Sequence, residues 1–422
     1  MENVIITFVT MLLLLALSCP VGVSIGAATI LGLYLSDMNL MLAAQRMFQL
    51  YDSFPLLAVP FFILAGEIMA RGTLAGELVS MCKTLVGHKR GGLALVTIFT
   101  CMFYAALCGS ALATTAAVGA IMIPAMIEDR YEKNFSIAAS VCAGTLGPVI
   151  PPSINLILYG SLASVAVPDL FIAGIGPGLL LTLGFCAAAY IISVRNNYGT
   201  IKEPTSAKQR LQAIWAAKWA LGVPVIVLGC IYGGLATPTE AGAGAVLYAI
   251  FVEFVITKSM TLKTLWTCLT ATLNTMGMVF IITMTANALG ILVQFHHVTD
   301  ALTTFMLTYV PNKYVFMLAL FILLLVLGML MEVTSLIIIL VPIMVPLAHG
   351  YGIDLVHFAQ FLLISIQMGL LTPPVGVNLY VGCSIGDTNL MALSKACIPY
   401  LISYIICVFL IAVFPQISLC LL

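Results

Sequence analysis

The chain has 422 residues, of which 62% are hydrophobic and only 8% are charged. So few charged residues cannot cover a water-facing surface of this size, which excludes a soluble enzyme. The 16 basic residues balance 16 acidic ones and no basic block remains, which excludes nucleic-acid binding and intrinsic disorder. The composition therefore indicates an integral membrane protein.

A membrane-spanning helix needs about 20 predominantly apolar residues, and this length defines the predicted spans. The first apolar stretch follows Glu2 and has no basic residue before it, so we interpret it as a span and not as a cleaved signal peptide. Residues 74–86 are amphipathic and predict an arm that lies along the membrane surface. The predicted spans are 4–18, 20–35, 54–70, 136–166, 170–194, 219–235, 241–257, 264–295, 355–386 and 397–420.

Two further apolar regions, 91–127 and 315–347, differ from the spans because each is interrupted near its middle. The interruptions are the small and polar residues at 108–115 and the sequence EVTS at 332–335. Non-helical backbone is tolerated at membrane depth only where protein buries it or where it lines a cavity. We therefore expect each region to form a re-entrant hairpin.

The distribution of Lys and Arg predicts the topology, because cytoplasmic loops collect these residues. With the N-terminus outside and both hairpins non-crossing, all of the 16 Lys and Arg residues except Arg46 and Lys313 fall on the cytoplasmic side. This bias predicts ten crossings and two hairpins that enter from opposite sides. The polar segment 195–218 is then a cytoplasmic linker between a first half, residues 1–194, and a second half, residues 219–422.

The two halves repeat when the sequence is shifted by 222 positions (373 − 151). Pro151 and Pro152 then fall on Pro373 and Pro374, where chance would align roughly 0.4 prolines over the whole overlap. Five crossings in each half, an odd number, invert the second half relative to the first. Inverted repeats are typical of secondary transporters, whose substrate and ion sites lie near the midplane where helices of both halves are broken.

The paired prolines at 151–152 and 373–374 predict those breaks. Proline cannot donate a backbone hydrogen bond and disrupts the preceding turn, so carbonyl oxygens are left free. A free carbonyl in lipid is costly and requires a hairpin tip, water or a bound cation. Na+ suits this need, and the half-helices that follow direct their positive N-terminal ends at a bound anion. The alternative interpretation is that each proline pair only kinks a helix.

Five segments together resemble the large membrane subunit of the tripartite ATP-independent periplasmic (TRAP) transporters, and the resemblance covers essentially the whole chain. It implies an all-α integral membrane protein, an inverted-repeat elevator-type transporter with two re-entrant hairpins and two broken helices. The segments are FPLLAVPFFILAG at 54–66, GSALATTAAVGAIMIP at 109–124, GPVIPPS at 147–153, ATPTEAGA at 236–243 and TPPVGVN at 372–378.

The resemblance also implies a function: Na+-coupled import of an organic acid across the bacterial inner membrane. Such proteins work with a small membrane subunit and a periplasmic substrate-binding protein, and we expect the small subunit to be a separate chain because this sequence starts directly at the first span. A self-sufficient ion-coupled symporter or antiporter of related architecture is the open alternative. The sequence has no HExxH, GxSxG or CxxC motif, so we expect neither an enzyme nor a cofactor other than Na+ as coupling ion. C4-dicarboxylates, sialic acids and sugar acids are all compatible cargoes.

The resemblance places the candidate sites at the hairpin tips and the helix breaks. The second-half cation site would use oxygens of Gly328, Met331, Glu332, Gly369, Thr372 and Val375. The 222-residue shift suggests a first-half site at Gly109, Ser110, Gly147, Ile150 and Ser153. The cargo would lie between the tips, near Ser110, Thr114, Thr115, Asn155, Thr334, Ser335 and Asn378. Hydroxyl groups at such tips can equally cap short helices.

Charged residues near these segments allow further interpretations. Neither tip carries Lys or Arg, so the positive field for a carboxylate would come from Na+ and helix ends. Glu332 either gives an oxygen to Na+ or caps the returning helix of its hairpin. Glu67 and Arg71, four positions apart, predict an ion pair on one helix surface. Glu240 predicts a structural role at an external turn, and the pair at 296–297, both histidines, predicts an interfacial turn and not a metal site.

Overall fold

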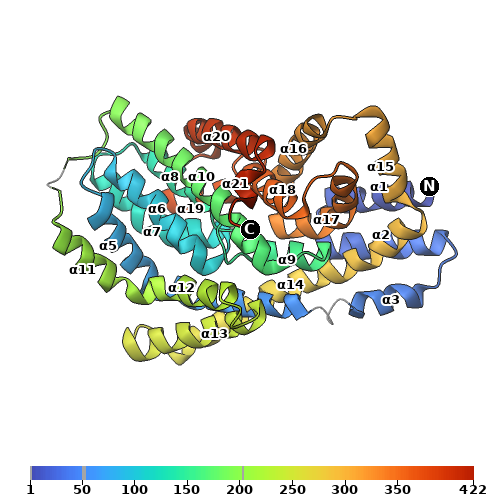
Figure 1. Ribbon diagram of the computed structural model, residues 1–422, viewed down its shortest axis with the longest axis horizontal. Coiled ribbons are helices and arrows are strands. Elements are labelled where there is room, and N and C mark those ends of the chain that lie inside the picture. The colour runs from blue at the N-terminus through green and yellow to red at the C-terminus, as the bar shows by residue number, and fades with distance from the viewer. Residues whose placement is uncertain (1, 50–53, 202–203) are drawn as a thin grey trace.

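The computed structural model describes residues 2–49, 54–201 and 204–422, and its regular elements in these ranges are helices (Figure 1). The first half contains α1 (Glu2–Ala16), α2 (Val21–Leu35), α3 (Leu40–Gln49), η2 (Phe54–Leu57), α4 (Ala58–Arg71), α5 (Leu74–Val86), α6 (Gly92–Cys108), α7 (Ala111–Glu128), α8 (Lys133–Gly144), α9 (Ile154–Ala163) and α10 (Val167–Arg195). The rest comprises α11 (Ala207–Ala216), α12 (Lys218–Tyr232), α13 (Pro238–Phe251), η3 (Val252–Ile256), α14 (Leu262–Phe295), α15 (Val298–Tyr309), α16 (Lys313–Leu330), α17 (Val333–Gly350), α18 (Leu355–Gly369), α19 (Val377–Gly386), α20 (Leu390–Val413) and α21 (Gln416–Leu419).

The outward faces of many helices are apolar, as a lipid environment requires. Leu12, Leu183, Val225, Leu247 and Leu273 are each at least 58% exposed. By length and composition, seven described helices can cross a membrane, or nine if two bent helix pairs each count as one span. Three of the seven, α7, α16 and α17, belong to the hairpins, whereas each broken segment consists of shorter helices. The number of long apolar helices therefore does not test the number of crossings. The ten predicted crossings stay a prediction.

Both predicted hairpins are confirmed, and each is closed at its base by a tyrosine. The first reverses between α6 and α7, and the hydroxyl oxygen of Tyr131 accepts a hydrogen bond of 3.3 Å from the amide of Leu93 at the start of α6. The second reverses between α16 and α17, and the Tyr351 hydroxyl donates to the carbonyl of Val310, just before α16, at 2.7 Å. The chain therefore returns to its point of entry in both cases.

The two broken helices are also confirmed. Residues 145–153 separate α8 from α9, and residues 370–376 separate α18 from α19. The Pro151–Pro152 and Pro373–Pro374 peptide bonds are both cis. The C-terminal pieces are exchanged between the halves, since α9 packs against α17 and α18 while α19 packs against α7 and α8 (Figure 1). The inverted repeats are thus interlocked.

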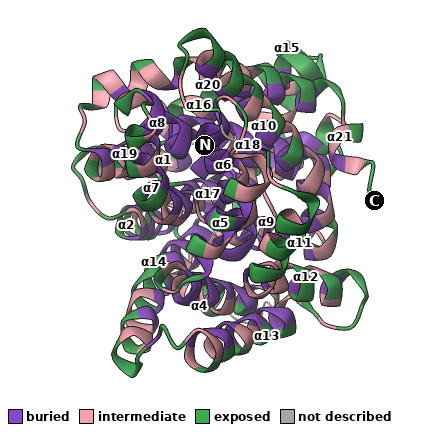
Figure 2. Cartoon of the chain, turned by 90° about the vertical axis from the view of Figure 1, so that its left-hand side faces the viewer, coloured by how far each residue is buried: buried purple, intermediate pink, exposed green. Residues whose placement is uncertain are grey.

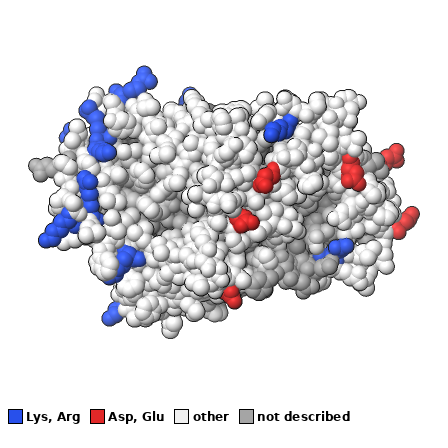
Figure 3. Space-filling view, viewed as in Figure 1, with Lys and Arg blue, Asp and Glu red and all other residues white. Residues whose placement is uncertain are grey.

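Burial and charge follow this arrangement. In α18, 13 of the 15 residues are buried, and Figure 2 shows buried residues concentrated on the helices of the interior. Figure 3 shows the Lys and Arg side chains of the visible face mostly at the end of the molecule where α5 and α11 lie, whereas Asp and Glu lie mostly toward the other end. This segregation agrees with the bias that the sequence predicts for the cytoplasmic side.

A sharp corner joins α4 to α5, the predicted arm, at an angle of 68°. The buried carboxylate of Glu253, which the sequence analysis missed, holds this corner against the end of α13. It accepts hydrogen bonds from the Thr73 amide at 3.1 Å and the Thr257 hydroxyl at 2.8 Å, and another from the Ser259 hydroxyl. A buried carboxylate needs several such donors, so Glu253 has a structural role here.

Three short helices, α3, α11 and α15, were not predicted, and α20 begins at Leu390 where the sequence predicted a start at 397. The short helices have 10 to 12 residues. Helices of this length are marginal alone and depend on tertiary packing, which a single sequence does not display. The predicted turn at 296–297 is confirmed, because His296 ends α14 and His297, with φ of 50°, precedes α15.

Candidate functional site

A cavity of about 370 Å³ lies where the two hairpin tips, the two helix breaks and the outer helices α4 and α14 meet. The tips contribute residues 108–113 and 332–334 to its walls. The breaks contribute Pro148, Ile154 and Asn155 from the first half and Gln367, Leu370 and Val377 from the second. The cavity therefore draws on both repeats, and each repeat supplies a hairpin tip, a helix break and one outer helix.

Four helices begin at the cavity wall. Its lining includes Ala111, Ile154, Val333 and Val377, which are the first residues of α7, α9, α17 and α19. The N-terminal end of an α-helix carries a partial positive charge and unpaired amide groups, and both favour an anion. No Lys or Arg of the described part of the chain lines the cavity. The positive field at the cavity thus comes from the backbone ends of these helices, while the carboxylates of Glu67 and Glu332 also line the cavity.

The first hairpin tip lies directly on the first helix break. A β-carbon at Gly147 would lie 2.5 Å from the carbonyl oxygen of Ser110, and one at Gly109 would lie 3.1 Å from the carbonyl oxygen of Pro152. Gly109 also has φ of 59°, in the left-handed region that favours glycine. The Ser110 side chain accepts from the amide of Ala113 at 3.5 Å. The backbones of tip and break are therefore in close contact, and a carbonyl oxygen of each faces the other segment.

The second tip repeats this contact with different residues. A β-carbon at Gly328 would lie 2.5 Å from the carbonyl oxygen of Ile366, and one at Gly369 would overlap the backbone of Gly328. The amide of Gly376 donates to the carbonyl of Met329 at 3.3 Å, which fixes the tip to the second break. Only glycine permits so close an approach of two backbones.

Glu332 has the geometry of a helix cap. Its carboxylate accepts from the amides of Thr334 at 2.9 Å and Ser335 at 3.4 Å, and from the Thr334 hydroxyl at 2.9 Å. A negative charge at the first turn of α17 is also favoured by the helix dipole. This structure accordingly shows the capping role, and the cation role of Glu332 stays a prediction.

The predicted cargo residues divide into two groups. Ser110, Asn155 and Thr334 line the cavity, and the Thr334 hydroxyl donates to the Asn155 side-chain oxygen at 3.2 Å. This bond links the second hairpin tip to the start of α9. The other four predicted residues are buried and do not line the cavity: Thr114, Thr115, Ser335 and Asn378.

Two of these buried side chains, Asn378 and Thr114, donate hydrogen bonds to backbone carbonyls. The Asn378 amide nitrogen donates to the carbonyl of Val141 at 2.7 Å and so joins α19 to α8. The Thr114 hydroxyl donates to the carbonyl of Ser110 at 2.8 Å. Both groups stabilise the frame around the cavity in this structure.

The predicted cation residues lie at the two contacts between tips and breaks. The Thr372 hydroxyl donates to the carbonyls of Met368 at 3.1 Å and Gly369 at 3.0 Å. The Ser153 hydroxyl donates to the carbonyl of Pro148 at 2.5 Å and accepts from the amide of Leu156 at 3.4 Å. Gly109, Ser110 and Glu332 line the cavity, Gly147, Gly328 and Gly369 form the close backbone contacts, and Ile150, Met331 and Val375 are partly buried beside them.

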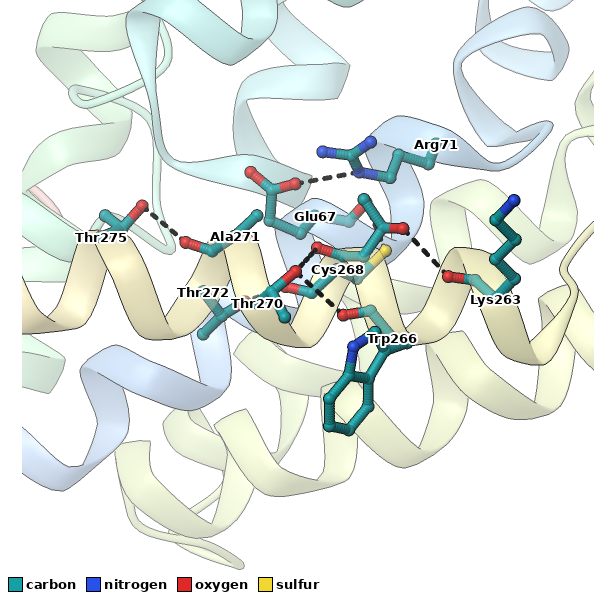
Figure 4. Close-up of polar contacts among 10 residues, drawn as sticks. Glu67, Arg71, Lys263, Trp266, Cys268, Thr270, Ala271, Thr272 and Thr275 are labelled. Carbon is teal, nitrogen blue, oxygen red and sulfur yellow. Dashed lines mark hydrogen bonds and ion pairs between the residues drawn. The ribbon is translucent and has the colours of Figure 1, made fainter.

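The outer wall of the cavity carries the predicted ion pair. Arg71 lies 3.2 Å from the Glu67 carboxylate, measured from its Nε atom, which confirms the pair, and Glu67 lines the cavity. Figure 4 shows this pair beside α14, which carries Cys268 and Thr275. The Cys268 thiol donates to the Glu67 carbonyl at 3.6 Å.

Sequence reasoning missed Gln367 and Thr275, which also line the cavity. Each lies within a predicted span, two residues before a glycine, and the glycines and prolines drew the attention instead. The available signal was the cost of a polar side chain inside a membrane segment, which makes such residues functional candidates.

Comparison of the sequence with a family model and with known proteins leads to the same protein family in each case. The family model described as "Tripartite ATP-independent periplasmic transporter, DctM component" matches residues 8–417. The sialic acid TRAP transporter large permease protein SiaM of Vibrio cholerae is 34% identical over 96% of this chain and 95% of that protein. The C4-dicarboxylate TRAP transporter large permease protein DctM of Rhodobacter capsulatus is 32% identical over 99% and 98%.

A third relative is longer than this chain. The isethionate TRAP transporter permease protein DctMQ of Oleidesulfovibrio alaskensis is 37% identical over 95% of this chain, which spans 63% of that protein. Among solved structures, the YdaH transporter of Alcanivorax borkumensis aligns with a TM-score of 0.66 at 14% identity, covering 88% of this chain and 87% of that one. MtrF of Neisseria gonorrhoeae aligns with a TM-score of 0.60 at 12% identity, covering 89% and 83%. At these identities the likeness is one of fold.

Proposed function

Because this chain belongs to the DctM component family of the tripartite ATP-independent periplasmic transporters, we propose that it is a large permease that imports an organic acid across the bacterial inner membrane. The observation that carries this proposal is the cavity onto which α7, α9, α17 and α19 all direct their N-terminal ends. An organic anion fits that field. The relatives named for sialic acid, C4-dicarboxylates and isethionate agree with this class of cargo.

Na+ is the proposed coupling ion. Support comes from the two places where a hairpin tip packs on a helix break, at Gly109 with Gly147 and at Gly328 with Gly369. Backbone carbonyls gather there, and a hard cation prefers such neutral oxygens. Since the same tips also line the cargo cavity, a cation that orders a tip would favour cargo binding, and the cargo would favour the cation by the same factor. This reciprocity would couple the two flows.

Transport would proceed by movement of one body against another. The hairpins, the broken helices, α10 and α20 pack together, whereas α4 packs against α13, and α14 against α2. The cavity lies between these two groups, so a displacement of the first past the second would open it to alternate sides. In this proposal residues 1–194 and 219–422 each supply part of both bodies, and residues 195–218 connect the halves.

Two partners complete the proposed transporter, a small membrane subunit and a periplasmic substrate-binding protein. The name DctMQ of the longer relative agrees with a second membrane component that works beside this one. The proposed site of action is the inner membrane, where a periplasmic protein can deliver cargo to the outer face.

Reconstitution into proteoliposomes tests the proposal. The chain with both partners should take up a radiolabelled organic acid when a Na+ gradient is imposed, and replacing Na+ with choline should abolish uptake. Uptake that ignores Na+ but follows a proton gradient would contradict the coupling. The chain assayed without its partners is the matched control, because uptake by the chain alone would support the alternative of a self-sufficient symporter or antiporter.

A further inference from the structure

Gln367 is a buried side chain on the last turn of α18, with 0% of its surface exposed. Neither its amide nitrogen nor its amide oxygen has a hydrogen-bond partner among the described residues. Of the buried side chains in residues 2–49, 54–201 and 204–422, Gln367 alone has two polar atoms without a partner. It also lines the cavity between the hairpin tips, and no other residue with an unpartnered buried atom does so in the described chain.

An unpaired buried amide destabilises a folded protein, because both its donor and its acceptor have lost water without replacement. At two matched positions a polar side-chain atom does find a partner. Gln360, two turns earlier on the same helix, donates its amide to the carbonyl of Leu170 at 2.9 Å. Thr145, the first-half counterpart of Gln367 under the 222-residue shift, donates its hydroxyl to the carbonyl of Cys142 at 2.7 Å. Each of those two side chains thus has a hydrogen-bond partner, although the side-chain oxygen of Gln360 has none. Gln367 differs because neither of its polar atoms has one.

The polarity of the cavity near Gln367 is opposite to that of the helix N-termini. Gln367 and Leu370, which both line the cavity, lie at the C-terminal end of α18. The C-terminal end of a helix carries a partial negative charge, which favours donor groups. A cargo that fills the cavity would thus place its anionic group toward the N-termini of the four helices and a hydrogen-bond donor toward Gln367.

We propose that Gln367 is a specificity-determining residue that binds a hydroxyl or N–H group of the cargo. Its side-chain oxygen accepts from that group, and its amide nitrogen donates to a neighbouring oxygen of the same molecule. The cargo is therefore an organic acid that carries a hydroxyl or amide beside its carboxylate or sulfonate. This inference rests on the proposed function, because it assumes that an organic acid occupies the cavity.

Binding to the purified full chain in Na+ tests the inference. The probes are N-acetylneuraminic acid, L-malate and isethionate, with succinate and ethanesulfonate as analogues that lack the hydroxyl of the latter two. Wild-type protein should bind at least one hydroxylated acid, and for malate or isethionate at least about tenfold more tightly than the analogue, since a site built to hydrogen-bond a hydroxyl rejects a ligand without one. For N-acetylneuraminic acid, the comparison is between wild type and a protein in which Gln367 is replaced by an apolar residue, and the affinity should fall about tenfold.

The variant Gln367→Met keeps the length of the side chain and removes both polar atoms, and Gln367→Leu repeats the test with another shape. Both should lose the preference for the hydroxyl while the cargo-free protein keeps or gains thermal stability. A merely structural role for Gln367 would instead lower that stability. Gln360→Met is the matched control, and it should lower stability while it leaves the preference intact.

Two results would overturn the inference, and they can be told apart. If wild type binds an acid and the Gln367 variants bind it with the same affinity and the same preference, the inference alone fails. If none of the five acids binds saturably in Na+, the proposed function fails, and the inference that rests on it fails as well.

Discussion

The first hairpin tip is capped by Ser110, whereas the second is capped by Glu332, at the same place in the repeat. Asn155 at the start of α9 lines the cavity and accepts a hydrogen bond from Thr334, whereas Asn378 at the start of α19 does not line the cavity and bonds to α8. The two halves thus share their turns and breaks but differ in the side chains that these features direct at the cavity.

The comparison separates the features that form the backbone around the cavity from the side chains that make its two sides different. The shared features are glycines and prolines, which act on the backbone, and they place carbonyl oxygens and helix ends around the cavity in both halves. The unshared features are polar side chains, and they make the cavity asymmetric. A cargo with unlike ends needs an asymmetric cavity, whereas a small spherical cation can be held by the same backbone frame twice.

The largest expected effect comes from the close glycine contacts in both halves. Gly369→Ala would drive a methyl group into the backbone of Gly328, and Gly147→Ala would do the same at the Ser110 carbonyl. Overpacking of this kind costs about 1–3 kcal/mol, and uptake should fall to about a tenth or less in both variants. The control is Gly290→Ala on α14, where an added β-carbon would meet no described atom within 4 Å. Normal uptake by Gly147→Ala would show that the halves do not share the frame.

The two asparagines should respond in opposite ways. Asn155→Ala removes a cavity-lining amide, so the half-saturating cargo concentration should rise about tenfold with little loss of thermal stability. Asn378→Ala leaves the carbonyl of Val141 without its donor and should destabilise the protein by about 1–3 kcal/mol. Uptake kinetics and thermal unfolding measure the two effects. Equal effects of both variants on cargo affinity would contradict the division between cavity and frame.

Removal of the two caps should show which tip is more strongly held. Glu332→Ala removes a charged cap with two backbone donors and should cost about 1–2 kcal/mol of stability, whereas Ser110→Ala should cost about 0.5–1 kcal/mol. Thermal unfolding in the same detergent gives the comparison. A larger loss for Ser110→Ala would reverse the order that the hydrogen bonds indicate.

The hydroxyl of Thr372 has no counterpart in the first half, where Ile150 takes the matched position. Thr372→Ala should therefore raise the Na+ concentration needed for half-maximal uptake by a few-fold, as expected for the loss of one neutral oxygen near a cation. Thr372→Ser is the conservative control and should keep most of the wild-type Na+ affinity. A change in cargo affinity without a change in Na+ affinity would remove Thr372 from the cation site.

The smallest effect concerns the starts of α2 and α13, where a proline lies at or next to the first residue of each helix. Helix α2 begins after Pro20 without a side-chain cap, whereas Thr237 and Glu240 form a reciprocal cap at the start of α13, which confirms the structural role predicted for Glu240. The hydrogen bonds from the Thr237 amide and hydroxyl lower the pKa of Glu240. A depressed carboxylate pKa stabilises the fold above its ordinary value, and this contribution is lost as pH falls through the folded value.

Glu240→Gln should therefore flatten the decline of thermal stability as pH falls below about 4.3, the ordinary pKa of a glutamate, and should leave the slope at neutral pH unchanged. The cargo cavity should be unaffected, because Glu240 does not line it. An unchanged pH profile in the variant would show that the cap does not contribute.

The sequence predicted the frame well because its determinants are local. Paired prolines at 151–152 and 373–374 identify helix breaks by their missing amides, and the small polar residues at 109–110 interrupt an apolar stretch that would otherwise span the membrane. Helix capping was one of the two roles predicted for Glu332. This role could be predicted because a carboxylate at the start of a helix accepts hydrogen bonds from the backbone amides of the first turn.

The parts that the sequence left open depend on contacts between distant elements. Asn155 and Asn378 occupy similar local patterns, and only the exchange of α9 and α19 between the halves decides which amide faces the cavity. Gln367 lies in an apolar helix whose burial on every side is set by its neighbours. Helices α3 and α15 are too short to be stable without their packing partners.

Equilibrium binding of radiolabelled Na+ to the purified chain tests most directly whether the two tip contacts hold the coupling ion beside the cargo. We expect saturable binding that strengthens when the organic acid is added, with part of the capacity lost in Gly147→Ala and part in Gly369→Ala. Binding that is absent in wild type, or that neither glycine variant changes, would contradict the account.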